Sequence, residues 1–158
     1  MTAAARVLGE EDWPTWRDLR LRALQDSPAA FGSTYARERD YTPAEWRELV
    51  GDPEDVCVVV ETAGGPAGLA GGYPDRPGLL HVIAMWVEPD ARGKGLAHLL
   101  LDAVAAWARE RGRGLHLDVQ TENLVARRSY ERYGFVGTGE TRPIRDGAAD
   151  RVERMVLG

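Results

Sequence analysis

The chain has very little cysteine. Cys57 is the single cysteine among 158 residues, so no internal disulfide can form. This favours a reducing compartment, and we expect a cytoplasmic protein. No apolar run reaches the roughly 18–20 residues that a bilayer requires, and the first residues lack the long apolar core of a signal peptide. We therefore expect no membrane association.

A basic excess is absent as well. The chain has 25 acidic residues against 20 lysines and arginines, which gives a formal net charge of −5. The arginines are scattered among acids, so the sequence shows no basic face of the kind that nucleic-acid binding needs. An acidic balance suits a cationic substrate such as an amine, but it is also common for solubility alone.

What the chain does have is the composition of one globular domain, expected to span residues 1–158. Hydrophobic residues make up 44% and charged residues 28% of the sequence. The hydrophobic patterning predicts an α/β fold with the order β-α-α-β-β-β-α-β-α-β-β. Strands are expected over 3–8 and 56–62, then over a segment of small residues that ends at residue 73. Further strands are expected over 79–87, 115–120, 135–141 and 151–158. Residues 74–78 are expected to form a turn.

The centre of the sequence predicts a β-α-β crossover. Strand 79–87 is followed by an amphipathic helix over 95–110 and then by strand 115–120, so the two strands should be parallel. In 115–120 the apolar residues alternate with polar ones. The odd-numbered residues should therefore face inward, and the even-numbered ones, including His116, should face outward.

The turn before this helix contains the run Arg92-Gly93-Lys94-Gly95. A helix N-terminus has unpaired backbone amides and the positive end of the helix dipole. Glycine lets a ligand approach those amides, and the two cations add positive charge. The combination predicts a phosphate or pyrophosphate site, with a plain solvated turn as the alternative.

Two common phosphate loops do not fit this turn. Lys94 is followed by Gly95 and not by the Ser or Thr that holds magnesium in a Walker loop. The dinucleotide fingerprint of three spaced glycines is also absent. ATP and NAD are therefore disfavoured as ligands.

Two segments resemble the GNAT (Gcn5-related N-acetyltransferase) superfamily. The run from Arg92 to Ala97 is similar to its acetyl-coenzyme A signature R/Q-x-x-G-x-G/A. The run "NLVARRSYERYGF" (123–135) is similar to a downstream motif, Asn-x-x-Ala-x-x-x-Tyr-x-x-x-Gly-Phe, and "ALQDSPAAFGSTY" (23–35) resembles a bacterial branch. The resemblance implies a small single-domain bacterial-type member with a mixed sheet of about seven strands and about four helices.

The resemblance also implies a coenzyme site, with acetyl-CoA as the co-substrate. Strand 79–87 would carry a bulge and separate from the next strand, and the pantetheine arm would lie in the gap. The residues that this assigns to coenzyme binding are Met85, Trp86, Val87, Arg92, Gly93, Lys94, Gly95, Leu96, Ala97, Asn123 and Ala126. Met85 and Trp86 would act through their backbone while their side chains join the core, and Asn123 also fits a helix N-cap.

For catalysis the resemblance implies that Tyr130 donates a proton to the coenzyme thiolate. Without the resemblance, an ordinary half-buried aromatic would be the favoured interpretation of Tyr130. His81 is the first candidate for the general base, because histidine titrates in the useful range, with a structural histidine as the alternative. Glu38 is a weaker second candidate. His98 and His116 are expected at the surface.

Direct transfer in a ternary complex is expected, because no base is apparent that could activate Cys57. The sequence shows no Cys/His cluster that would indicate a metal. The expected acceptor is the amine of a small molecule or a peptide, with Phe31, Tyr35 and Tyr73 candidates for lining its pocket. A non-catalytic acyl-CoA sensor is the alternative function, and a homodimer is left open, because many relatives are dimers.

Overall fold

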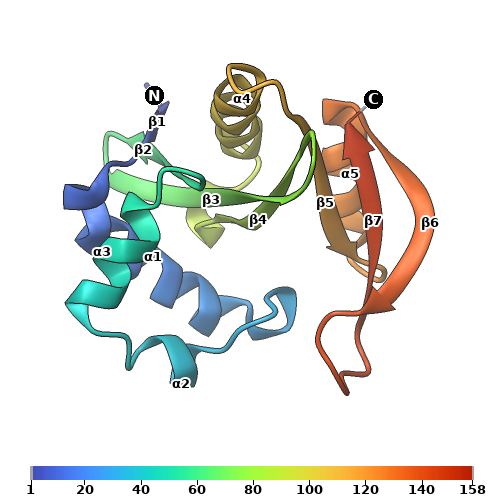
Figure 1. The fold of residues 1–158 in the computed structure, drawn as a ribbon, viewed down its shortest axis with the longest axis horizontal. Coiled ribbons are helices and arrows are strands. Elements are labelled where there is room, and N and C mark those ends of the chain that lie inside the picture. The colour runs from blue at the N-terminus through green and yellow to red at the C-terminus, as the bar shows by residue number, and fades with distance from the viewer. Residues whose placement is uncertain (1, 158) are drawn as a thin grey trace.

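The structure, a computed structural model, describes residues 2–157. Met1 and Gly158 lie outside the described residues. The expected domain includes both of them, and the expected last strand includes Gly158. Seven strands form one mixed sheet in the order β1-β2-β3-β4-β5-β7-β6 (Figure 1). The strands are β1 (Ala4–Val7), β2 (Val56–Thr62), β3 (Gly65–Arg76), β4 (Leu79–Val87), β5 (Gly114–Gln120), β6 (Phe135–Pro143) and β7 (Arg151–Leu157).

The described chain contains five α-helices. They are α1 (Trp13–Asp26), α2 (Tyr35–Glu38), α3 (Pro43–Gly51), α4 (Leu96–Arg109) and α5 (Leu124–Tyr133). The sequence predicts about four helices, and the additional one is the short α2. Its N-terminus is capped by the Thr34 hydroxyl, which accepts a hydrogen bond from the Arg37 amide at 3.2 Å. Among residues 2–157 no helix has the length and apolar character needed to cross a membrane.

The predicted α/β class, the strand order in the sequence and the parallel pairing of β4 with β5 are confirmed. The predicted turn over 74–78 is wrong at its start, because β3 continues to Arg76, opposite Leu79. The pairing of β3 with β4 is irregular between Tyr73 and Arg76, and an irregularity of this kind accommodates Pro74, which has no amide to donate.

Helices cover both faces of the sheet (Figure 1). On one face α4 and α5 pack over a cluster that includes Leu100, Leu101 and Val104, all fully buried. On the other face α1 and α3 pack over a second cluster, in which Trp16 and Trp46 are almost wholly buried. The sheet is therefore the middle of three layers, and its two sides have separate cores.

The sheet opens between β4 and β5. Their parallel ladder runs from Leu79 and Gly114 to Val82 and Leu117 and ends there. Just beyond, Ala84 has a φ of 62°, a left-handed conformation that is rare for a residue with a β-carbon. The register of β4 against β3 shifts at the same place, which is the mark of a bulge. The strand therefore bends away from β5, and this is the bulge and gap that the family resemblance implies.

Glu38, the weaker candidate base, is a structural residue. It is 4% exposed, and both of its carboxylate oxygens accept hydrogen bonds from Arg20 at 2.8 Å. The pair joins α2 to α1, and the Arg20 guanidinium also lies over the Phe31 ring at 4.9 Å from its centroid. Both oxygens of the Glu38 carboxylate are thus held by the one Arg20 guanidinium, so Glu38 is poorly placed to accept a proton from a substrate.

We expect Glu38→Gln to lower the free energy of unfolding by about 3 kcal/mol, because it leaves the buried Arg20 guanidinium without its counter-charge. Chemical denaturation monitored by tryptophan fluorescence measures this change. The matched control is Asp40→Asn, whose carboxylate pairs with Arg39 at 3.7 Å in an exposed position and should change the stability by less than about 0.5 kcal/mol. Equal effects of the two substitutions would contradict the structural role of Glu38.

Candidate functional site

The glycine turn opens onto free space. Gly93 and Gly95 have φ values of 78° and 81°, so the backbone conformation itself requires glycine. A β-carbon at either position would meet nothing within 4 Å. Gly95 is the N-cap of α4 and has no side chain to satisfy the first-turn amides. Those amides are therefore available to an anionic ligand, as the sequence predicted.

The two cations of this turn have different roles. The Arg92 guanidinium donates to the Val87 carbonyl at 2.8 Å and to the Asp26 carboxylate at 2.9 Å. Lys94 is exposed, and no acid in residues 2–157 forms an ion pair with it. Arg92 therefore holds the turn in place, whereas the Lys94 ammonium is free to meet a ligand.

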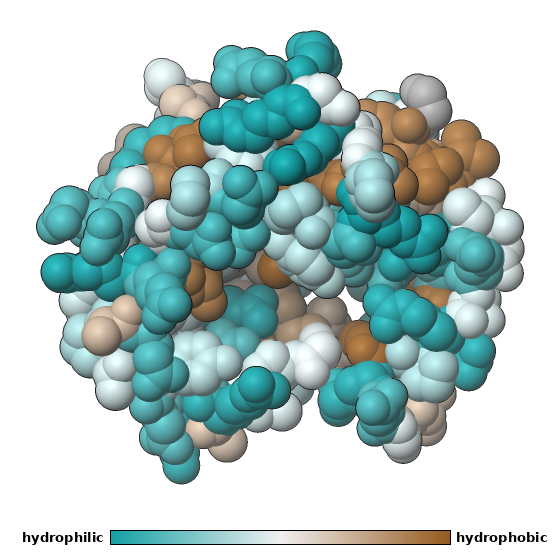
Figure 2. Space-filling view, in the orientation of Figure 1, coloured by the Kyte–Doolittle hydropathy of each residue, from teal (hydrophilic) through white to brown (hydrophobic). Residues whose placement is uncertain are grey.

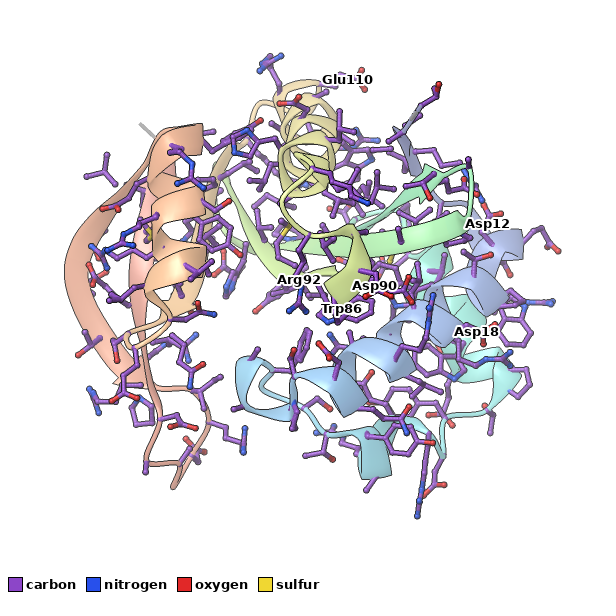
Figure 3. All side chains as sticks on the ribbon, turned by 180° about the vertical axis from the view of Figure 1, so that it is seen from behind. Asp12, Asp18, Trp86, Asp90, Arg92 and Glu110 are labelled. Atoms are coloured by element: carbon purple, nitrogen blue, oxygen red, sulfur yellow. The ribbon has the colours of Figure 1, made fainter. Side chains whose placement is uncertain are left out.

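The Trp86 indole shares the same anchor. It donates to the Asp26 carboxylate at 3.0 Å, and Figure 3 shows Trp86 and Arg92 close together near the start of α4. Hydrogen bonds from Trp86, Ser27 and Arg92 lower the pKa of Asp26. Asp26 ends α1, so this contact fixes the helix layer to the bulged strand and to the turn.

The remaining residues around the turn contribute mainly backbone. Leu96 and Trp86 are buried in the two cores, and Met85 and Val87 pack partly against the first core. Beyond Val82 the edge of β4 that faces β5 is not paired with a strand in the described chain. The exposed polar groups on this edge are therefore backbone amides and carbonyls. Ala97 is partly buried in the first turn of α4.

Two adjoining cavities, of about 110 and 250 Å³, lie where β4 and β5 separate. Both are lined by Phe31, Val82, Ala84 and Asp118. Figure 2 shows the surface hollowed between the α1–α2 region and the turn that joins β6 to β7. The gap in the sheet thus contains two connected compartments with different walls.

The smaller cavity is lined from α5. Tyr130 and Ala126 of α5 line it together with Asn123 and Met85. The Asn123 side chain accepts a hydrogen bond from the Ala126 amide at 3.1 Å, so it caps α5 as its residue type predicted. Burial raises the pKa of Tyr130 to about 12. Its phenol is therefore protonated at neutral pH.

The larger cavity is lined by His81, Ser33 and Arg142. His81 is 7% exposed and lies in register with Tyr73 on β3 and with His116 on β5. The Ser33 hydroxyl is buried and has no hydrogen-bond partner among the described residues. This wall of the larger cavity therefore has an unused hydroxyl and an imidazole.

The prediction that His116 faces solvent is wrong. His116 is 1% exposed, and its Nε2 lies 2.7 Å from the Asp75 carboxylate while Arg154 Nη1 lies 2.7 Å from its Nδ1. The alternation of 115–120 was correct, but the outward face is covered by polar neighbours from β3 and β7. His98 is also only partly exposed, edge-on to the Tyr133 ring at 5.4 Å.

Charged groups surround His81. Asp118 Oδ2 lies 3.7 Å from His81 Nε2, and Asp118 is also bound by Arg154 at 2.7 Å and by Arg142. Burial opposes ionisation of Asp118, but the hydrogen bond and charge of Arg154 outweigh it and lower its pKa. Burial lowers the pKa of His81, and the negative charge of Asp118, which raises that pKa, offsets the effect only in part. His81 is therefore neutral, and able to accept a proton, near pH 7.

No metal-ligand cluster is apparent in the sequence, but in the fold Asp75, His81 and His116 place one donor atom each within 4.8 Å of one another. Arginine is always a donor, so Arg154 requires a lone pair on His116 Nδ1 and puts the proton on Nε2. That proton faces Asp75, where a metal would need a lone pair. The arrangement favours a hydrogen-bond network over a metal site.

The fold brings only some of the aromatic residues predicted to line the acceptor pocket to the cavities. Phe31 is buried and lines both cavities. Tyr35 packs on the second core and lines neither cavity. Tyr73 is 38% exposed and its ring lies 5.3 Å from that of His81. The residues that sequence reasoning missed are Ser33, Asp75, Asp118 and Arg154, which lie in four separate parts of the chain.

Sequence comparison identifies the family of this site. Residues 13–135 match the family described as the acetyltransferase (GNAT) family. An acetyltransferase of Agrobacterium fabrum, Atu2258, is 41% identical over 71 residues, which are 44% of this chain and 50% of that protein. An uncharacterized N-acetyltransferase of Methanocaldococcus jannaschii, MJ1207, is 25% identical over 85% of this chain and 61% of its own length. The matches thus span about half of these curated relatives.

Solved structures share the fold. A GNAT-family acetyltransferase from Streptococcus pneumoniae superposes with a TM-score of 0.78 at 22% identity, over 98% of both chains. A putative acetyltransferase from Salmonella typhimurium, solved with acetyl-CoA, also gives 0.78, at 20% identity over 99% of this chain and 94% of that one. At these identities the likeness shows the fold alone.

We expect Cys57 to be inert in the folded protein. It is buried in the second core, and burial raises the pKa of its thiol to about 12. At pH 8 only about one thiol in ten thousand is then ionised, and the thiolate is the reactive form. Ellman's reagent should label no thiol in the native protein at pH 8 and one thiol in guanidinium chloride. Rapid labelling of the native protein would contradict this and reopen an acetyl-cysteine route.

Proposed function

The chain belongs to the GNAT acetyltransferase family, and on that premise we propose that it transfers an acetyl group from acetyl-CoA to a primary amine. The observation that carries the proposal is the gap between β4 and β5. The glycine turn is bonded to the end of the bulged strand through Arg92 and the Val87 carbonyl, Tyr130 lines one cavity of the gap and His81 lines the other.

The residues present fit the coenzyme. The open first-turn amides of α4, with the unpaired Lys94, suit a pyrophosphate. The unpaired edge of β4 beyond Val82 suits the amide groups of a pantetheine arm, which can hydrogen-bond as a strand does. The thioester supplies the activated acetyl group. The smaller cavity, with Tyr130 and Asn123, would hold that end of the coenzyme.

The proposed reaction is a direct transfer with two proton movements. His81 takes a proton from the acceptor ammonium and leaves the amine lone pair free. The amine nitrogen forms a bond to the acetyl carbon, the carbon–sulfur bond breaks, and its electron pair leaves on sulfur. Tyr130 gives its phenolic proton to that sulfur, and the second amine proton returns to solvent as the amide forms. The proton held by His81 then returns to Tyr130 through solvent, so the cycle releases the amide, free coenzyme A and one proton and restores both side chains.

The acceptor would enter through the larger cavity. The His81 ring lines it, and the Asp118 carboxylate, which is bound by Arg142 and Arg154, lies beside Nε2. Ser33 offers an unpartnered hydroxyl, and Phe31 offers an apolar wall. The cavity fits the amine of a small molecule or the side chain or terminus of a peptide.

We expect Gly95→Glu to abolish acetyl-CoA binding, because it strains the left-handed backbone and places a carboxylate at the open amides. Isothermal titration calorimetry with the purified protein measures the affinity, and we expect a loss of at least about 100-fold. The matched control is Gly112→Glu. Gly112 also has a positive φ, of 69°, with nothing within 4 Å, but it lies after the far end of α4. Unchanged binding in Gly95→Glu would refute the coenzyme site.

We expect Tyr130→Phe to lower kcat by about 100-fold while acetyl-CoA affinity stays within about threefold, because the phenol acts on the leaving group. Release of free thiol during turnover, with a panel of amines as acceptors, measures the rate. His81→Gln should lower kcat similarly and remove the acidic limb of the pH profile. A protein that binds acetyl-CoA but acetylates no amine, and whose variants behave like the parent, would be the non-catalytic sensor instead.

A further inference from the structure

His81 has a second polar neighbour, on the side away from the cavity wall. Its Nδ1 atom is buried and lacks a hydrogen-bond partner in the described chain. The nearest acid on that side is Asp75, whose Oδ2 lies 3.5 Å from Nδ1. This is just beyond an ordinary hydrogen bond, so a small shift of either side chain would complete one. A buried polar atom with one candidate partner so close indicates a contact made during function.

We propose that Asp75 is a positioning residue for His81: its carboxylate holds the Nδ1 proton of the ring, leaves the Nε2 lone pair to the substrate, and stabilises the imidazolium that forms. This inference rests on the proposed function, in which His81 is the base. Asp75 itself would not touch the substrate, because it lines neither cavity.

His116 fixes the orientation of Asp75. Arg154 donates to His116 Nδ1 at 2.7 Å, so the proton of a neutral His116 is on Nε2, and it points to Asp75 Oδ1 at 2.7 Å. One oxygen of Asp75 is thereby held by a donor, and the other is left on the side of His81. His116 cannot serve as the base, since its only lone pair already accepts from an arginine.

The strand register builds this arrangement. Tyr73, His81 and His116 are paired across β3, β4 and β5, and Asp118 pairs with Arg154 across β5 and β7. Asp75 is two residues beyond Tyr73, and Asp118 two beyond His116. Side chains two apart share a face of a regular strand, so Asp118 lies on the face of His116. Asp75 lies in the irregular end of β3, and its contacts with His116 and His81 place its carboxylate on that same face.

The charges that face His81 suit a proton acceptor. Asp75 from β3 and Asp118 from β5 approach its two ring nitrogens, while Arg142 of β6 and Arg154 of β7 offset the charge of Asp118. Burial and the charge of Asp75 raise the pKa of the Tyr73 phenol, so Tyr73 is neutral and adds no charge beside His81. A protonated His81 would lie between two carboxylates, one of which, Asp75, has no arginine bound to it.

The first test is a double-mutant cycle. If Asp75 acts through His81, Asp75→Asn should lower kcat at least 10-fold in the parent enzyme but less than twofold in a His81→Gln background. The KM for acetyl-CoA should not change in either. Equal losses in the two backgrounds would show a merely structural role and overturn the proposal. Glu110→Gln, which removes an exposed negative charge at the far end of α4, is the control (Figure 3).

The pH profile gives a second readout. The Asp75 carboxylate raises the pKa of His81, so removing its charge should lower that pKa further. The acidic limb of kcat/KM, where His81 must be deprotonated, should therefore move to lower pH in Asp75→Asn. An unmoved limb with a reduced plateau would argue against the proposal.

A measurement without turnover separates this inference from the proposed function. Long-range nitrogen–proton NMR spectra of the histidine rings report which nitrogen carries the proton. We expect His116 protonated on Nε2 and neutral His81 protonated on Nδ1, with the His81 midpoint lowered in Asp75→Asn. If these NMR results were obtained with a protein that acetylates no amine, the proposed His81–Asp75 contact would stand and the proposed acetyltransferase activity would be refuted. If the His81 titration were unchanged in Asp75→Asn and that variant were fully active, the proposed His81–Asp75 contact would be refuted and the acetyltransferase activity would stand.

Discussion

The site depends on one backbone constraint, the left-handed conformation of Ala84 in the middle of β4. A residue with a β-carbon at φ 62° is strained by about 1–3 kcal/mol and persists only where its surroundings hold it. Here β3 pairs with β4 on both sides of the bulge, and Ala84 is buried in the second core. The strain ends the β4–β5 ladder and leaves an unpaired strand edge inside the protein. The two cavities, which we propose hold the coenzyme and the acceptor, lie beside that open edge.

A second constraint holds the walls of the gap. The Asp26 carboxylate at the end of α1 accepts from the Trp86 indole on the bulged strand and from the Arg92 guanidinium of the glycine turn. The end of α1 thus shares one carboxylate oxygen with two residues that lie 60 and 66 positions later in the sequence. Arg92, although part of the motif, is used to shape the turn, and the open amides and Lys94 are left to face a ligand. The motif therefore combines a structural cation with a binding surface.

The polar face beside the gap shows why a buried histidine can act as a base. Burial keeps His81 neutral, and the carboxylates of Asp75 and Asp118 lie where the charge of a protonated ring would develop. The arginines of β6 and β7 prevent these acids from repelling each other strongly. Burial and charge thus oppose one another at His81, and the balance allows the ring to gain and lose a proton.

The sequence by itself determined the elements and the open glycine turn of the proposed coenzyme site. Strand and helix periodicity, the Asn123 cap and the glycines before α4 are local features, set within a few residues. The acceptor half was decided by the tertiary structure. Asp75, His116, Asp118 and Arg154 meet because β3, β4, β5 and β7 pair in one register. The alternation of β5 placed His116 on the correct face, but only pairing with β7 and the β3–β4 hairpin could show that this face is buried.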